Sequence, residues 1–188
     1  MAEAGTKRWT LAEIEALPYD EWTRYEIIDG ELFVSTAPGD HHQAVCTRGT
    51  VALSIWNDRS GLGVVRGGPG LIFSDYDVVI PDIVWMSRER FGAIWRDDKL
   101  RGAPELVVEV LSPGAANERR DRQNKLKLYA AWGVDEYWVV DWRALTVDVF
   151  RCGDAELSFV GTLGAQETLT SLLLPGFSLD VGRLFDRP

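Results

Sequence analysis

The segment PELVVEVLSP, residues 104–113, most constrains the fold because it reads as a strand that must be buried on both faces. Its aliphatic side chains leave no polar face for solvent: Leu106, Val107, Val108, Val110 and Leu111. A helical pattern follows at about 117–132, and strands follow at 136–141 and 146–151. The expected fold class is therefore α/β or α+β, with one central mixed β-sheet and helices packed against it.

A short helix and a β-hairpin are expected before this core. TLAE fits a capping box that begins at Thr10, and Pro18 follows the end of the helix. The Asp-Gly pair inside YEIIDGELFVS, residues 25–35, is typical of a hairpin turn. We expect one domain over residues 1–188, which comprises an N-terminal helical extension (1–24), the hairpin (25–40), the core (41–151) and a C-terminal tail (152–188).

The segment between the hairpin and the buried strand is expected to begin with a helix. Asp40, with Gln43 three residues later, is expected to cap this helix at about 41–57. The elements expected next are short strands separated by glycines at 61–63 and 67–70, a longer strand at 76–87 and a brief helix at 87–95. The tail is expected to hold a final strand or turn and a short helix.

Composition indicates an ordinary globular protein. Of the 188 residues, 46% are hydrophobic and 26% are charged, which is far from the composition of disordered chains. No apolar run reaches the ~18 residues that span a bilayer, and no signal peptide is apparent, so no membrane association is expected. The two cysteines, Cys46 and Cys152, show no metal-ligand spacing and favour a reduced, cytoplasmic location.

The net charge of −9 argues mildly against a general nucleic-acid binder, because such proteins neutralise phosphates with basic residues. The segment 118–127 reverses this sign locally, with five basic residues against Glu118 and Asp121. Its basic residues are Arg119, Arg120, Arg122, Lys125 and Lys127. A local basic patch therefore remains compatible with nucleic-acid binding.

Glu109 stands in the middle of the buried strand and needs an explanation. An ionised carboxylate buried without a partner costs several kcal/mol, roughly, so proteins neutralise it, pair it or place it on a metal. Asp82 is a second carboxylate among apolar neighbours, because alternation places it on one face of the strand 76–87. That face comprises Val78, Ile80, Asp82, Val84 and Met86. Pro81 predicts an edge strand or a bulge at this point.

Lys125 supplies a cation on the helix that follows. Leu128, Tyr129 and Trp132 lie at +3, +4 and +7 from it, so Lys125 shares the stripe that packs on the sheet, whereas Lys127 points elsewhere. Two carboxylates suit a hard cation such as Mg²⁺ or Mn²⁺, and the ammonium can stabilise developing negative charge.

Each of these residues also has a simpler interpretation. Glu109 is explained equally well as a salt-bridged strand residue, Asp82 as a turn residue after proline, and Lys125 as a side chain that extends to solvent. Tyr129 and Trp132 are better explained as core residues than as base-stacking residues. Only the joint occurrence of the three polar groups in adjacent elements favours a site.

These residues resemble a known family. PD at 81–82 followed by ELVVEVLSP at 105–113 is similar to the first two parts of the PD-(D/E)xK nuclease superfamily. The ordered set of motifs, which runs from about residue 20 to the C-terminus, resembles the Uma-two family of predicted endonucleases. The motifs are YEIIDGEL (25–32), HQ (42–43), GAPELVVEVLSP (102–113), KLKLYAAWGVDEYWVVD (125–141) and LPGFSLDVGRLF.

The resemblance implies a restriction-endonuclease-like core, with a four-stranded mixed sheet flanked by helices. It implies that Asp82, Glu109 and the main-chain carbonyl of Val110 bind Mg²⁺ or Mn²⁺, and that a metal-activated water attacks a DNA phosphodiester. Lys125 would be the third catalytic residue. The superfamily lysine normally stands two residues after the glutamate, where this chain has Leu111, so the lysine is moved to the following helix.

The resemblance also suggests further neighbours of the site. Glu26 and Glu31 fall within its hairpin motif and either supply a further acidic group or are solvated strand residues. His42 begins a helix, where capping by Asp40 already explains the local pattern.

Expected partners and alternative functions follow from the same residues and motifs. Phosphate contacts are expected from Arg119, Arg120 and Arg122, and a homodimer is expected because nucleases that cut both strands often pair two sites. The alternatives are a nuclease fold kept for binding or assembly without turnover, and hydrolysis of RNA or another phosphodiester.

Overall fold

The computed structural model, which describes residues 7–18, 21–154 and 156–186, contains a six-stranded mixed main sheet in the order β12-β11-β10-β9-β6-β3. The neighbours β9 and β10 run parallel, and the other neighbouring pairs of this sheet are antiparallel. Its strands are β3 (Gly63–Gly67), β6 (Ile83–Ser87), β9 (Leu106–Val110), β10 (Glu136–Asp141), β11 (Thr146–Gly153) and β12 (Glu156–Gly164).

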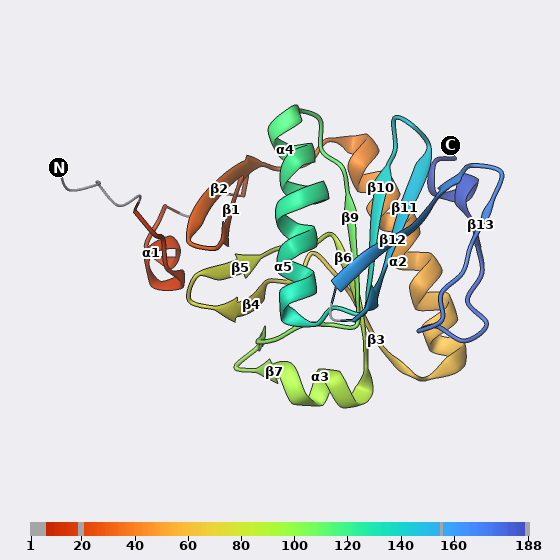
Figure 1. Ribbon diagram of the computed structural model, residues 1–188, viewed down its shortest axis with the longest axis horizontal. Helices are drawn as coiled ribbons and strands as arrows, with labels where there is room; N and C mark the ends of the chain where they lie inside the picture. The colour runs from red at the N-terminus through yellow and green to blue at the C-terminus, as the bar shows by residue number, and fades with distance from the viewer. Residues whose placement is uncertain (1–6, 19–20, 155, 187–188) are drawn as a thin grey trace.

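A second six-stranded sheet, in the order β2-β1-β5-β4-β8-β7, lies beside the main sheet (Figure 1). It carries the N-terminal hairpin, so the hairpin belongs to a larger unit than expected. Its strands are β1 (Thr23–Ile28), β2 (Glu31–Thr36), β4 (Leu71–Ser74), β5 (Asp77–Val79), β7 (Trp95–Arg96) and β8 (Lys99–Leu100), and a separate small ribbon pairs β13 (Thr168–Leu169) with β14 (Leu179–Asp180).

Helices cover both faces of the main sheet, as the buried strand predicts (Figure 1). One face packs against the helix after β9, through Leu128 and Tyr129, and the other packs against α2, through Val45 and Leu53. None of the helices in the described ranges is long and apolar enough to span a bilayer. The helices are α1 (Leu11–Glu15), α2 (Asp40–Ser60), α3 (Arg88–Ile94), α4 (Ala115–Arg119), the π-helical turn η1 (Arg120–Asn124), α5 (Lys125–Trp132) and the 3₁₀-helix η2 (Val181–Leu184).

The first helix and the hairpin are confirmed. Thr10 and Glu13 form the reciprocal hydrogen bonds of a capping box. The hairpin turns at Asp29 and Gly30, whose φ angles of 50° and 78° are those of a type I′ turn. The Asp-Gly pair suits this turn because both central residues must adopt positive φ.

Replacement of Gly30 by alanine is expected to destabilise the fold by about 1–2 kcal/mol. The positive φ disfavours any side chain, and a Cβ atom at this position would lie 2.8 Å from Arg8 Nε. Thermal unfolding of Gly30→Ala measures the effect. Gly92→Ala is the matched control, because its added Cβ meets nothing within 4 Å. Equal melting temperatures for the two variants would contradict this interpretation of the turn.

The predicted continuous strand at 76–87 is wrong. Pro81 and Asp82 separate β5 from β6, and these two strands belong to different sheets. Proline cannot donate a ladder hydrogen bond, which explains why the strand stops there. The expected common face breaks with it, because Val78 packs in the second sheet whereas Val84 and Met86 pack in the main core.

Three further expectations differ from the structure. The helix α2 has Gly39 at its N-cap, and Asp40 is its first residue rather than its capping side chain. The segment 152–188 contributes the nine-residue edge strand β12 to the main sheet, beyond the expected strand or turn and short helix. The main sheet accordingly has six strands where the resemblance implied four.

Candidate active site

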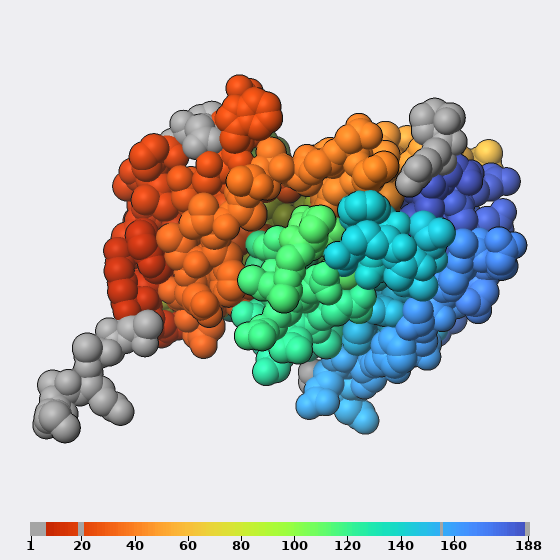
Figure 2. All heavy atoms as spheres, turned by 90° about the horizontal axis from the view of Figure 1, so that it is seen from above, coloured from red at the N-terminus to blue at the C-terminus, as the bar shows by residue number. Residues whose placement is uncertain are grey.

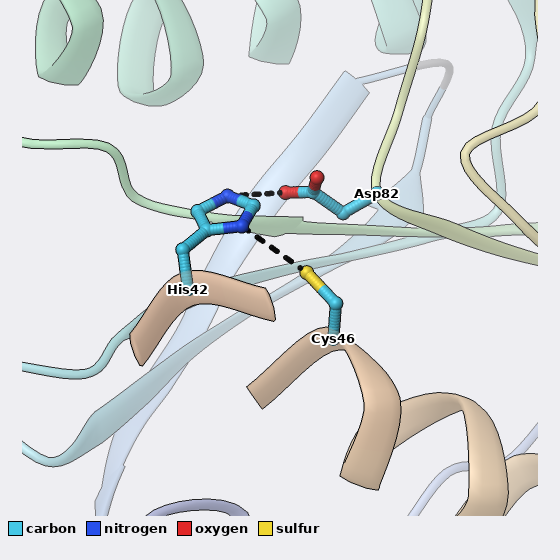
Figure 3. A group of neighbouring side chains, drawn as sticks. All are labelled: His42, Cys46 and Asp82. Carbon is cyan, nitrogen blue, oxygen red and sulfur yellow. Dashed lines mark hydrogen bonds and ion pairs between the residues drawn. The ribbon is translucent and has the colours of Figure 1, made fainter. Parts of the chain in front are cut away.

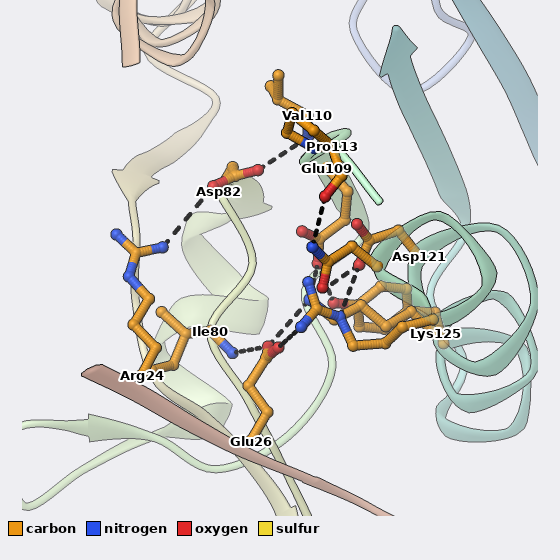
Figure 4. A network of polar contacts seen from close by, with 12 residues as sticks. Arg24, Glu26, Ile80, Asp82, Glu109, Val110, Pro113, Asp121 and Lys125 are labelled. Carbon is orange, nitrogen blue, oxygen red and sulfur yellow. Dashed lines mark hydrogen bonds and ion pairs between the residues drawn. The ribbon is translucent and has the colours of Figure 1, made fainter. Parts of the chain in front are cut away.

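Antiparallel pairing of β6 with β9 brings Asp82 and Glu109 together. Ile83 pairs with Val108, so Asp82 and Glu109 are the next residues along two neighbouring strands. The side chains are 8% and 4% exposed, respectively. Asp82 Oδ2 accepts a hydrogen bond from the main-chain N–H of Val110, at 2.8 Å, which ties the carboxylate to the end of β9 (Figure 4).

Lys125 reaches Glu109 from the helix that covers this face. Lys125 Nζ lies 2.9 Å from Glu109 Oε1, and the Tyr129 hydroxyl donates to the same oxygen at 2.7 Å. Lys125 itself is 1% exposed. Its side chain therefore does not extend to solvent, and Tyr129 is a buried core residue that also holds the Glu109 carboxylate.

The π-helical turn η1 directly precedes Lys125 and changes which residues face the site. Five residues of a regular α-helix rotate by about 140° beyond a full turn, so Arg120 and Lys125 would point in different directions. The wider π turn returns Arg120 to the inner face. Arg120 Nε lies 3.0 Å from Asp121 Oδ1, and Asp121 Oδ1 lies 3.7 Å from Lys125 Nζ. Turns of this kind occur frequently at functional sites.

Glu26 joins the cluster from the second sheet. Glu26 Oε1 lies 2.9 Å from Lys125 Nζ and accepts a hydrogen bond from the main-chain N–H of Ile80 at 2.8 Å. Its other oxygen lies 3.5 Å from Arg120 Nη1. Lys125 therefore connects a carboxylate of each sheet through one ammonium group.

Burial and crowding of negative charge control the protonation of Glu109. Burial raises its pKa to about 8, although the Lys125 ammonium opposes this rise. The neighbouring carboxylates of Asp82, Asp121 and Glu26 raise it further. A cation in this place would favour the ionised form.

Asp82 and Lys125 are held in their charged forms. Burial alone would raise the pKa of Asp82, but hydrogen bonds from His42 and from the Val110 N–H hold this pKa below its usual value. Burial disfavours the ammonium of Lys125, yet the carboxylates around it outweigh this effect and raise its pKa. The site thus contains Asp82 in its ionised form beside Glu109, whose raised pKa favours the protonated form.

The cluster lines a small cavity of about 30 Å³. The volume exceeds the roughly 10–15 Å³ that one water molecule requires. Seen from above, the hairpin β1–β2 and the helix α4 lie on opposite sides of a hollow in the surface (Figure 2). Four carboxylates and three cations face the cavity: Glu26, Asp82, Glu109 and Asp121, with Arg24, Arg120 and Lys125.

The chemistry of this lining fits a divalent cation. Carboxylate oxygens are the ligands that Mg²⁺ and Mn²⁺ prefer, and Asp82 and Glu109 are adjacent and face the same cavity. Burial, and after it the neighbouring carboxylates, raise the pKa of Glu109, and a bound cation would oppose both effects by favouring the ionised form. Asp82 and Glu109 are the residues that would hold it.

His42 lines the same cavity and holds Asp82 from helix α2. The first turn of α2 places His42 Nε2 3.2 Å from Asp82 Oδ2. Cys46, one helical turn later, has its Sγ 3.4 Å from His42 Nδ1 (Figure 3). Burial, together with the charges of Asp82 and Glu109, raises the pKa of Cys46, so its thiol is protonated and can donate to His42.

The remaining predicted residues are placed differently. Glu31 is exposed on β2 and does not line the cavity, and Trp132, which is 40% exposed, stacks on Phe73 instead of packing in the core. Arg120, expected to contact phosphate from the surface, is buried in the cluster. Arg122 pairs with Asp141 and Asp148, and Arg119 is exposed: of the three predicted arginines, only Arg119 lies on the surface without a described ion pair.

Sequence reasoning assigned no role to Asp121, Arg24 or Cys46. Two of them carried a usable signal, because Asp121 stands four residues before Lys125 and Cys46 four residues after His42. Residues at this spacing share one face of a helix. Arg24, whose Nη1 lies 4.0 Å from Asp82 Oδ1, depends on the packing of two sheets and carried no such signal.

A family model and a solved structure resemble this chain in sequence and in fold, respectively. The family model of Uma2, described as "Putative restriction endonuclease", matches residues 11–182. Among solved structures, a "putative nuclease belonging to DUF820" from Anabaena variabilis is similar, with a TM-score of 0.75 and 19% identity over 94% of this chain and 97% of that chain. The type IIG restriction endonuclease BpuSI gives a TM-score of 0.44 at 12% identity, over 80% of this chain and 17% of that chain. No curated protein matches.

Proposed function

Because the chain belongs to the Uma2 family of restriction-endonuclease-like proteins, we propose that it is a Mg²⁺- or Mn²⁺-dependent endonuclease that hydrolyses DNA phosphodiester bonds. The convergence of Asp82, Glu109 and Lys125 on one cavity is the observation that carries this proposal. These residues come from a strand junction, a strand and a helix, and an ion pair joins Lys125 to Glu109.

In this proposal Asp82 and Glu109 hold the ion, together with the main-chain carbonyl of Val110. A bound divalent cation would act as a Lewis acid on the phosphodiester and would lower the pKa of water. His42 and the Val110 N–H keep the Asp82 carboxylate oriented, and Tyr129 does the same for Glu109. The side chains are thus preorganised before substrate arrives.

Lys125 has the role of charge stabilisation. Its ammonium faces the cavity beside Glu109, where negative charge develops on the phosphate oxygens during hydrolysis. Arg120 lines the same cavity and gives a second positive charge within it. The position of Arg120 favours a contact with the phosphate at the reacting centre over the peripheral contact expected from its sequence context.

Nicking of supercoiled plasmid tests this function. With Mg²⁺ or Mn²⁺, Asp82→Asn is expected to lower the rate by about 10²-fold or more, because the neutral amide removes a charged ligand. Asp180→Asn, on the exposed strand β14, is the matched control and should cut at the wild-type rate. Chelation by EDTA should abolish cutting in both active proteins.

Two results would overturn the proposal. Equal nicking by the wild type and Asp82→Asn would mean that the activity does not use this site. Absence of nicking by the wild type, together with absence of Mg²⁺ and Mn²⁺ binding by calorimetry, would favour a binding or assembly function. A parallel RNA substrate separates a ribonuclease from a deoxyribonuclease.

A further inference from the structure

Three side chains with different donor atoms meet where α2 approaches the start of β6: His42, Cys46 and Asp82 (Figure 3). We propose that they form a binding site for a thiophilic divalent cation such as Zn²⁺, distinct from the carboxylate site for Mg²⁺ or Mn²⁺. Asp82 belongs to both sites. Zinc held here would therefore withdraw Asp82 from the proposed catalytic centre and inhibit it.

The distances suit a tetrahedral ion. Zn–N bonds of about 2.0–2.1 Å and Zn–S bonds of about 2.3 Å put two ligand atoms about 3.6 Å apart. Cys46 Sγ and His42 Nδ1 are separated by 3.4 Å. One ligand atom from each of the three side chains lies within 4.8 Å of the others. Contraction of the longest separation by about 1 Å would bring all three to zinc-ligand spacing.

The helix holds two of the ligands in place. His42 and Cys46 stand four residues apart in α2, so they lie one above the other on the same helical face. His42 is 5% exposed, and its ring is already held between Cys46 and Asp82. The site thus requires adjustment of side chains, because the 21-residue helix fixes the backbone of His42 and Cys46, and the hydrogen bond from the Val110 N–H holds Asp82 at the start of β6.

The donor set discriminates between cations. Sulfur, imidazole nitrogen and one carboxylate oxygen are a typical zinc combination, whereas Mg²⁺ prefers oxygen ligands and keeps several waters. Three protein ligands leave a fourth position for water. Zinc would displace the proton from the Cys46 thiol, and this proton would pass to solvent. The two cations therefore recognise different subsets of one cluster and compete only through Asp82.

Cobalt titration tests the binding without any nuclease activity. Co²⁺ replaces Zn²⁺ in tetrahedral sites, and a thiolate ligand gives it a strong near-ultraviolet charge-transfer band. The wild type and Cys152→Ser should both show this band, because Cys152 is an exposed cysteine outside the cluster. Cys46→Ser should lose the band and should bind Zn²⁺ about 10²-fold more weakly in a competition titration. A band that survives in Cys46→Ser, or that is absent from the wild type, would overturn the proposed site.

The inhibitory consequence rests on the proposed nuclease function and has its own measurement. Micromolar Zn²⁺ is expected to slow Mg²⁺-dependent nicking by the wild type and by Cys152→Ser at least tenfold. Cys46→Ser, compared with its own zinc-free rate, should keep most of its activity. If nicking fails in every protein while the cobalt band remains, the zinc site stands and the nuclease proposal fails. Equal inhibition of all three proteins would overturn the inhibitory role.

Discussion

Replacement of Glu109 by glutamine is expected to abolish plasmid nicking and, at the same time, to raise the melting temperature of the metal-free protein. In the proposed mechanism the carboxylate binds the cation, so its loss should lower the rate by about 10²–10³-fold. Its negative charge nevertheless opposes folding, because it lies buried beside three other carboxylates. Glutamine keeps an oxygen that accepts hydrogen bonds from Lys125 and Tyr129 but removes this charge.

The pH dependence of this gain has a definite sign. The folded-state pKa of Glu109 is about 8, above its ordinary value of 4.5. Protonation of Glu109 therefore stabilises the fold fully below about pH 4.5, and this contribution is lost as pH rises through 8. Glutamine is neutral at every pH. The unfolding free energy of Glu109→Gln should therefore exceed that of the wild type by an amount that grows between about pH 4.5 and 8 to roughly 1–3 kcal/mol.

Calorimetric melting in EDTA at about pH 5, 7 and 8.5 measures the effect. Glu156→Gln, which changes an exposed glutamate of β12, is the matched control and should melt like the wild type at each pH. A lower melting temperature for Glu109→Gln would show that the ion pair with Lys125 outweighs the crowding of carboxylates. Wild-type nicking by this variant would remove Glu109 from the catalytic proposal.

Replacement of Lys125 by methionine is expected to cost about 3–5 kcal/mol of unfolding free energy at about pH 8 in the absence of metal, because it leaves buried carboxylates without their shared cation. Lys125 Nζ lies 2.9 Å from both Glu26 Oε1 and Glu109 Oε1 and 3.7 Å from Asp121 Oδ1, so one substitution breaks three buried ion pairs. Methionine fills a similar volume, which isolates the loss of charge from the loss of packing.

This destabilisation should shrink at low pH. Lys125 lowers the pKa of Glu109, so removal of the ammonium raises a pKa that is already about 8. A group whose folded-state pKa is raised contributes stability at low pH and loses it as pH rises, so the part of the loss that comes from Glu109 should disappear near pH 5, and the loss of the contacts with Glu26 and Asp121 should remain. Urea unfolding at both pH values, with and without Mg²⁺, measures this dependence.

Lys127→Met is the matched control for this experiment. Lys127 is exposed on the same helix, two residues further along, and its replacement should change stability by less than about 0.5 kcal/mol. Equal unfolding curves for the two methionine variants would contradict the interpretation of Lys125 as the cation shared by the buried carboxylates. A pH-independent loss for Lys125→Met would indicate that packing, rather than charge, determines its effect.

The sequence alone was sufficient to predict how Lys125 is oriented. Leu128 and Tyr129, at +3 and +4, are buried against the main sheet, and Lys125 shares their inward direction. The same periodicity predicted that Trp132 lies in the core. This prediction is wrong, because the helix ends at this residue and Gly133 turns the chain away. Periodicity therefore predicts which residues face the core within a helix, but it does not do so at the last turn.

The path of the chain at Pro81 could not be derived by counting alternate residues. Alternation assumes that one strand continues, but here the chain leaves the second sheet after Val79 and enters the main sheet at Ile83. Proline signalled an irregularity without specifying its kind. Asp82 reached the interior because of the pairing between β6 and β9, which is a long-range contact that local pattern does not encode.

Arg120 illustrates a second limit of sequence reasoning. Its surroundings in ERRDRQNKLK are charged, and a regular helix would not turn it to the same face as Lys125. The π-helical turn η1 alters the rotation of the backbone between these residues. No residue type in the segment specifies this turn, because it is a change in hydrogen-bond partner from one main-chain group to the next.

The junction at Pro81 and Asp82 also has a mechanical consequence. Glu26 belongs to one sheet, Glu109 belongs to the other, Asp82 lies on the connection between them, and Lys125 pairs with both glutamates, so an ion held by Asp82 and Glu109 would affect the contact between the two sheets. Binding of the proposed ion would then be linked to how tightly the two sheets are held together. Slower amide hydrogen exchange along β1 of the wild type on addition of Mg²⁺ would report this effect.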